Sequence, residues 1–166
     1  YFALKRRYAR AATAWTETPE QQQNAWSVLS AEHGVYPSAL TLAPYDTAIT
    51  DLDDAALDTW ADRVRTALTS WLYHPFRSDT APKETPAKRM IVLAGREYVT
   101  PLVERDVFER ARPNRMAAPI IEIHTPFQDQ GFDGIGEQMS WLADQIEQIS
   151  VGQTTVELEA FGAGIE

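Results

Sequence analysis

The sequence contains no cysteine and only three histidines. Without cysteine the chain cannot form a disulfide, hold a metal through thiolates or use a thiol nucleophile, so any catalysis must use other groups. His33, His74 and His124 are isolated from one another and show no metal-ligand spacing. We therefore expect no metal site and no cofactor, and the lack of cysteine fits the reducing cytoplasm, where we expect the protein to reside.

Long apolar runs and an excess of positive charge are also missing. No stretch approaches the length of a membrane span and no signal-peptide pattern opens the chain, so we expect no membrane association. The formal charge is −9, from 24 acidic and 15 basic residues, and the average field repels nucleic acid. A local basic patch lies at Lys5, Arg6, Arg7 and Arg10, which is either a solvated helix face or a phosphate-binding stripe.

The 166 residues are 44% hydrophobic and include five tryptophans, which suffices for one buried core. We therefore predict a single domain over residues 1–166. The chain opens inside a helical pattern rather than at methionine, and we expect a preceding segment to be missing. Residues 74–89, which contain three prolines, are predicted to form a loop insertion, and residues 150–166 a tail or edge strand.

Hydrophobic spacing predicts helices alternating with short strands. A helical stripe opens the chain, and another covers residues 54–72 with aspartates at its start. A further helix is expected to begin with Thr100 as its cap and Pro101 in its first turn, and the last helix to follow Asp133 as a cap with Gly134 and Gly136 at its start. Apolar runs at 26–29, 90–93 and 119–123 are strand candidates. The predicted fold is α/β, a three-layer αβα structure with a small, mostly parallel central sheet that lacks its N-terminal strand.

Polar residues follow each predicted strand. Ser30 and His33 follow the first strand, Gly95 and Arg96 the second, and His124 the third. Because ligands bind beyond the carboxyl ends of the strands in open sheets of this kind, these residues are candidates for one site. A histidine in such a position can equally cap a turn or complete a hydrogen bond of the core. An arginine there can clamp a phosphate or carboxylate, or form an ion pair with a neighbouring acid.

Asp46 follows Pro44 and Tyr45 in a turn-prone segment. Its carboxylate is either a catalytic group or an acceptor for backbone N–H groups that holds the loop. Gly134 and Gly136 leave N–H groups free for an anion, although a lone Gly-x-Gly is weak evidence and Asp133 opposes the charge. The sequence contains no Gly-x-Ser-x-Gly elbow, phosphate-loop lysine or His-Glu-x-x-His pattern that would name a reaction.

Four sequence blocks carry a resemblance. They read LSAEHG (29–34) with PYD (44–46), LAGREY (93–98) followed by Pro101 and Leu102, and GIGEQMSWL (134–142). In this order and spacing the chain resembles an uncharacterised prokaryotic domain family. It departs from that family at Glu32, where the family has a basic residue, and in lacking the strand and lysine motif that the family carries before the position of Tyr1. Glu32 argues against anion binding at its turn.

The first two blocks are also similar to those of YaaA-type peroxide-stress proteins and, more distantly, of uracil-DNA-glycosylase-like domains. This resemblance implies a three-layer α/β fold and a nucleobase, nucleotide or nucleic acid as partner. The leading hypothesis is an enzyme that hydrolyses or exchanges an N-glycosidic bond, with Asp46 stabilising the sugar or orienting water and His33 supplying a proton to the departing base. The expected substrate-binding residues are Ser30, Gly34, Tyr45, Gly95, Arg96, Tyr98, Gly136 and Gln138. The alternatives are a binding module without catalysis and a protein-interaction domain.

Overall fold

A computed structural model describes residues 1–13, 25–73, 89–111 and 122–162. The chain divides into two units, one formed by residues 1–26 with 132–166 and the other by residues 27–131, and each is described by itself. The single domain expected over residues 1–166 stays a prediction. The predicted loop at 74–88 and most of the predicted strand at 119–123 lie outside the described residues.

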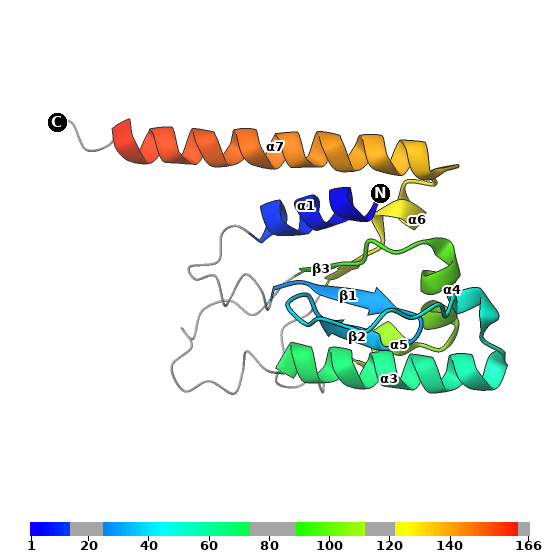
Figure 1. Ribbon diagram of the computed structural model, residues 1–166. Helices are drawn as coiled ribbons and strands as arrows, with labels where there is room; N and C mark the ends of the chain where they lie inside the picture. Colours follow the sequence, from blue (N-terminus) through cyan, green and yellow to red (C-terminus); the bar gives the residue numbers. More distant parts are fainter. Residues whose placement is uncertain (14–24, 74–88, 112–121, 163–166) are drawn as a thin grey trace. The chain divides into compact units, whose positions relative to one another are not determined.

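The first unit is a pair of helices, α1 (Phe2–Ala12) and α7 (Ile135–Gly162), which pack side by side (Figure 1). The Tyr8 ring lies 5.9 Å from the Trp141 ring, and Phe132 contacts the same indole at 6.3 Å. Tyr8 and Leu142 are buried. The apolar stripes that the sequence shows at the two ends of the chain therefore form helices, as predicted, and these aromatic contacts join them.

Two expectations for α7 are wrong. The helix continues to Gly162, so residues 154–160 are helical rather than an edge strand. Their weak alternation was too short to outweigh the helical pattern that precedes them. At the other end, the Asp133 carboxylate is not the cap: the backbone N–H of Asp133 donates to the Glu137 carboxylate at 2.7 Å. The acidic side chain at this helix start is therefore that of Glu137, which lies inside the helix and accepts the backbone N–H of a residue before it.

The second unit contains two small sheets. β1 (Ser27–Ser30) and β2 (Gly34–Pro37) form an antiparallel hairpin in which Ser30 pairs with Gly34. β3 (Arg89–Ile91) and β4 (Glu122–His124) form a parallel pair. The fold is therefore a mixed α/β fold, but the described strands do not join in the expected largely parallel sheet. The predicted first strand exists and pairs with the residues directly after its turn.

Short helices surround these strands: η1 (Ile49–Asp51), α4 (Arg96–Glu104), α5 (Val107–Arg110) and α6 (Pro126–Asp129). The position of α4 corrects an expectation. It begins after Gly95, whose backbone is extended, and Pro101 lies inside the helix rather than at its start. Because Pro101 has no N–H, the helix loses one internal hydrogen bond there, and the sequence signal of a helix start at Thr100 was misleading.

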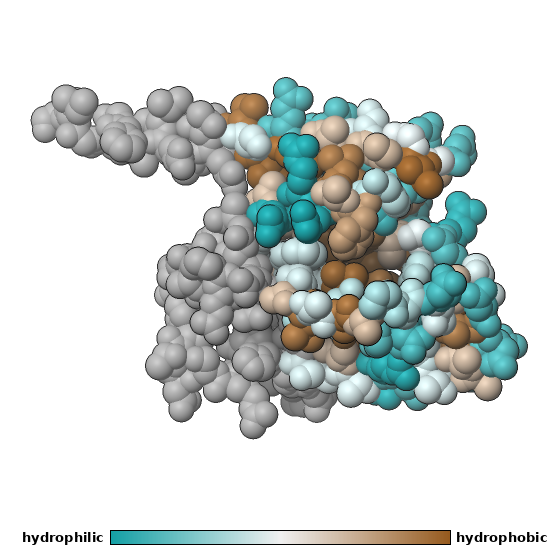
Figure 2. Space-filling model, viewed as in Figure 1, coloured by the Kyte–Doolittle hydropathy of each residue, from teal (hydrophilic) through white to brown (hydrophobic). Residues whose placement is uncertain are grey.

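The long helix α3 (Asp54–Tyr73) carries the core of this unit and confirms the helix predicted over residues 54–72. Asp53 begins it, since its carboxylate accepts the Ala56 N–H at 2.9 Å. Trp60, Val64 and Leu68 share one face and are buried. They belong to a core cluster of Ala31, Ile49, Trp60, Ala61, Val64, Leu68, Met90, Leu102, Val107 and Ala111. Figure 2 shows mostly hydrophilic residues over the outer surface of α3.

Among the described residues, no helix has the length and apolar character required to cross a membrane.

Candidate functional site

The turn between β1 and β2 is held by Ser30, His33 and Trp60. The Ser30 hydroxyl accepts the backbone N–H of His33 at 3.1 Å, and the Trp60 Nε1–H donates to the Ser30 carbonyl at 2.8 Å. Ser30 is 1% exposed. Its predicted contact with substrate is therefore replaced by a structural role, in which the hydroxyl sets the turn and the carbonyl anchors it to α3.

Gly34 completes this turn with φ of +71°, a left-handed conformation that favours glycine. A Cβ at this position would lie 3.3 Å from the Cγ and Cδ atoms of Arg63. The Arg63 Nη1 donates to the Glu32 carbonyl. The aliphatic part of Arg63 thus covers the glycine while its guanidinium binds the turn. Gly34, which the sequence predicts to bind substrate, is here a close-packing position.

The segment that contains Tyr45 packs against the same turn. The His33 and Tyr45 rings are nearly perpendicular, with centroids 5.1 Å apart, and the Tyr36 ring lies 6.2 Å from His33. The Thr47 hydroxyl donates to the Glu32 carboxylate. The sequence blocks around positions 29–34 and 44–46 therefore meet in space through a ring contact and a hydrogen bond.

Tyr98, in the first turn of α4, belongs to the same neighbourhood. Burial, and then the nearby Tyr45 phenol, raise the pKa of both Tyr36 and Tyr98, and Glu97 raises that of Tyr98 further. The Tyr98 ring also lies 6.1 Å from Trp60. We call His33, Tyr36, Tyr45 and Tyr98 the ring cluster. It reaches the surface at Tyr45, which is 43% exposed.

The three phenols of the ring cluster make no hydrogen bond to another described residue. A partly buried tyrosine hydroxyl ordinarily has a partner, so these groups are available to water or to a ligand. Together with the imidazole they combine aromatic surface with polar groups, which is the composition of a site for a flat, partly polar molecule.

The raised pKa values of Tyr36 and Tyr98 predict a loss of stability in alkali. In the unfolded chain both phenols ionise near the ordinary tyrosine pKa of 10.0, whereas in the folded chain they ionise at a higher pH. Their contribution to stability is therefore complete below pH 10 and falls as the pH rises above 10 toward the higher folded pKa. We expect ultraviolet titration of tyrosinate to show late-ionising groups that Tyr36→Phe and Tyr98→Phe each reduce.

The chain unfolded in denaturant is the reference for this titration, since burial is lost there. Titration curves that coincide for the folded and unfolded chain would contradict the prediction.

Gly95, Arg96 and Glu97 form the start of α4. Arg96 is exposed and pairs with no acid among the described residues, so the alternative of a local ion pair is not observed there. Glu97 instead lies over Gly95, where an added Cβ would meet its Oε1. An acid already stands at this positive helix end, which makes it a poorer anion site than the sequence suggested.

Asp46 is exposed and follows Tyr45 directly. The expected alternative was that its carboxylate would hold the loop through backbone N–H groups. In the described part of the chain that work is done by Asp51, whose carboxylate accepts the Ala48 N–H at 2.9 Å, and Asp46 makes no hydrogen bond or ion pair. The loop-holding role that the sequence left open for Asp46 is therefore not observed among the described residues.

The remaining candidates are His124, Gly136 and Gln138. His124 ends β4, and its Nε2 lies 3.4 Å from the Glu122 carboxylate between two exposed side chains, which is neither the turn cap nor the core hydrogen bond that the sequence left open. Gly136 and Gln138 belong to the other unit, where the Gln138 amide oxygen accepts the Tyr1 hydroxyl. Their contribution to the site stays a prediction. No group of three metal-ligating side chains occurs among the described residues.

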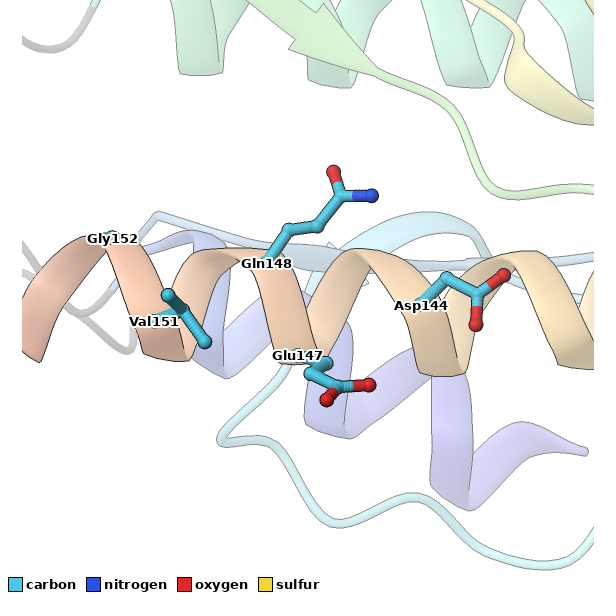
Figure 3. Close-up of a pocket in the computed structure, with 5 residues that line it drawn as sticks. All are labelled: Asp144, Glu147, Gln148, Val151 and Gly152. Atoms are coloured by element: carbon cyan, nitrogen blue, oxygen red, sulfur yellow. The ribbon is translucent and has the colours of Figure 1, made fainter.

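A hollow of about 570 Å³ lies on α7, lined by Asp144, Glu147, Gln148, Val151 and Gly152. Figure 3 shows these residues on a single helix, with the Gln148 side chain extending away from that of Glu147. Residues of one helix cannot enclose a ligand by themselves. The hollow therefore does not compete with the ring cluster as a candidate site.

Sequence reasoning missed Tyr36, Trp60 and Arg63. Tyr36 lies outside the sequence blocks, but its place in β2 beside the hairpin turn would have indicated it had the hairpin been predicted. Trp60 and Arg63 lie in the helix predicted over residues 54–72, but the sequence did not indicate their hydrogen bonds to the β1–β2 turn. Such links between distant segments leave no local signal in the sequence.

The model of a family of unknown function, DUF6884, matches residues 1–144. No curated protein and no solved structure matches the chain.

Proposed function

We propose that this chain, which belongs to the DUF6884 family, binds a nucleobase-containing compound at the ring cluster. The observation that carries the proposal is the perpendicular contact of His33 with Tyr45 at 5.1 Å, beside phenols with no partner among the described residues. A nucleobase is flat, stacks on aromatic rings and carries polar edges, and an exposed tyrosine beside free hydroxyls offers both kinds of contact.

Tyr45 is the natural stacking surface in this proposal because it is the most exposed ring of the cluster. The phenols of Tyr36 and Tyr98 are donors and acceptors for the base edge. Arg96, exposed and two residues before Tyr98, is placed to contact a phosphate of a nucleotide or nucleic acid.

The proposed reaction is cleavage or exchange of the N-glycosidic bond. Asp46, beside Tyr45 and without a partner among the described residues, is the candidate to stabilise positive charge on the sugar or to orient water. His33 is the candidate donor to the departing base. The sequence feature that points to this reaction is the resemblance of the first two sequence blocks to those of uracil-DNA-glycosylase-like domains.

Two measurements on one set of variants test binding and reaction separately. Calorimetric titration with nucleosides and nucleotides should show binding that Tyr45→Ala lowers by about tenfold or more, because loss of one base-aromatic stack is worth about 1–3 kcal/mol. Release of free base from modified DNA, RNA and nucleosides should fall by about 100-fold or more in Asp46→Asn and His33→Ala.

Tyr1→Phe is the matched control, since Tyr1 is also an exposed tyrosine but belongs to the other unit. Binding that survives Tyr45→Ala unchanged would refute the proposed site. Base release with the same rate in Asp46→Asn and His33→Ala would refute their roles. Binding without base release in the unaltered chain would leave the binding module and eliminate the enzyme.

A further inference from the structure

We propose that the ring cluster selects a base that carries a positive charge, such as a purine methylated on a ring nitrogen. This inference rests on the proposed function and narrows its ligand class. It comes from the charges placed next to the rings, which the resemblance to other families did not indicate.

Three residues of the ring cluster each have a carboxylate as their neighbour in the chain. Glu32 precedes His33, Asp46 follows Tyr45, and Glu97 precedes Tyr98. All three acids are exposed. Because His33 and Tyr45 are in ring contact and Tyr45 lies near Tyr98, the three acids come from separate segments to the same region. Glu97 also raises the pKa of Tyr98, which is the effect of a local negative field.

The cations of this region balance the acids incompletely. Arg63 donates to the Glu32 carbonyl, and its stem lies against the position of Gly34. Arg96 precedes Glu97 at the start of α4 and is exposed. Among the described residues next to the rings in the chain, three acids thus stand against two arginines, one of which donates to a backbone carbonyl. A positive charge on a ligand over the rings would be stabilised, whereas a negative charge at the same place would be destabilised.

Aromatic rings add to this preference. The face of a tyrosine ring attracts a cation within about 6 Å of its centre, and rings combined with carboxylates form the usual site for permanently charged methylammonium groups. A methylated purine cation joins the two properties, since it stacks like any base and carries the charge in its ring. The cluster therefore suits such a base better than its neutral isomer.

The charge also fits the proposed reaction. When the bond between the sugar C1′ and the base nitrogen breaks, the bonding electron pair goes to the base, and a cationic base leaves as a neutral molecule. Water adds to C1′ and gives its proton to the Asp46 carboxylate. The departing base then needs no proton, so the loss of base release expected for His33→Ala applies to neutral bases and not to cationic ones.

Two isomeric nucleosides provide the test. 1-Methyladenosine is protonated and therefore cationic at neutral pH, whereas its isomer N6-methyladenosine stays unprotonated and neutral. We expect calorimetric titration of the full chain to show about tenfold tighter binding of 1-methyladenosine. Glu97→Gln, which keeps the shape and removes one charge, should reduce this preference about threefold. Glu104→Gln, an equivalent change at the far end of α4, should leave it unaltered.

The outcomes separate this inference from the proposed function. Equal affinity for the two isomers, or tighter binding of N6-methyladenosine, would overturn the charge selectivity and leave the nucleobase site standing. A preference for 1-methyladenosine that Glu97→Gln and Glu104→Gln reduce equally would also overturn it, because the ring cluster would not be the source. Absence of binding by both nucleosides and by unmethylated nucleotides would overturn the proposed function itself.

Discussion

A Trp60→Ala variant should lose about 3–5 kcal/mol of unfolding free energy, the usual cost of deleting a buried tryptophan. Trp60 is 2% exposed and is among the largest fully buried side chains. The substitution leaves a cavity beneath the β1–β2 turn and removes the donor to the Ser30 carbonyl. For a domain of ordinary stability this loss is a large part of the total. Urea denaturation followed by circular dichroism measures it.

Two neighbouring variants isolate the causes. Trp60→Phe keeps most of the ring but removes the Nε1–H, and leaving the buried Ser30 carbonyl without its partner should cost about 1–3 kcal/mol. Thr59→Ala alters an exposed side chain that bonds its own helix, and should stay within about 0.5 kcal/mol. If Trp60→Ala behaved like Thr59→Ala, the indole would not hold this unit together.

Gly34→Ala is the second change with a large expected effect. Forcing an L-residue into the left-handed region costs about 1–2 kcal/mol, and Gly34 has φ of +71°. The new methyl group would also press on the Arg63 stem, whose guanidinium binds the Glu32 carbonyl. We therefore expect Gly34→Ala to destabilise the chain and to move the turn that carries His33, so that binding at the ring cluster weakens as well.

Gly131→Ala provides the matched control. Gly131 also has a positive φ, of +65°, but an added Cβ would meet nothing within 4 Å. Gly131→Ala should lose only the unfolding free energy that an L-residue costs in the left-handed region. The difference between the two variants then measures the cost of the contact with Arg63 at Gly34. Equal loss in both, with ligand binding unchanged in Gly34→Ala, would contradict the close packing of Arg63 on the turn.

The helices of this chain were predictable because their apolar residues recur along one face. The periodicity of Trp60, Val64 and Leu68 identified α3 correctly, and the aspartates marked its start. The strands were harder, since each described strand is three or four residues long. A run of that length does not reveal its partner, so an antiparallel hairpin was taken for one strand of a parallel sheet.

Candidate site residues were likewise predictable where the signal is local and not where it depends on distant parts of the chain. His33 was identified from its position after an apolar run and Tyr45 from the sequence block at 44–46, and their rings lie 5.1 Å apart. The role of Ser30 was misjudged because its two hydrogen bonds depend on the fold around it, one of them from Trp60. Gln138 belongs to the other unit, where it accepts a hydrogen bond from Tyr1, and its contribution to the site stays a prediction.

The two sheets differ in what their formation demands of the unfolded chain. Ser30 and Gly34 meet across a tight turn, whereas Met90 must find Ile123 across an intervening segment that includes α4 and α5. Closing the longer loop costs more chain entropy and is repaid by only three paired residues on each strand. The parallel pair consequently depends on the packing of the helices between its strands, while the hairpin can form from its own neighbours.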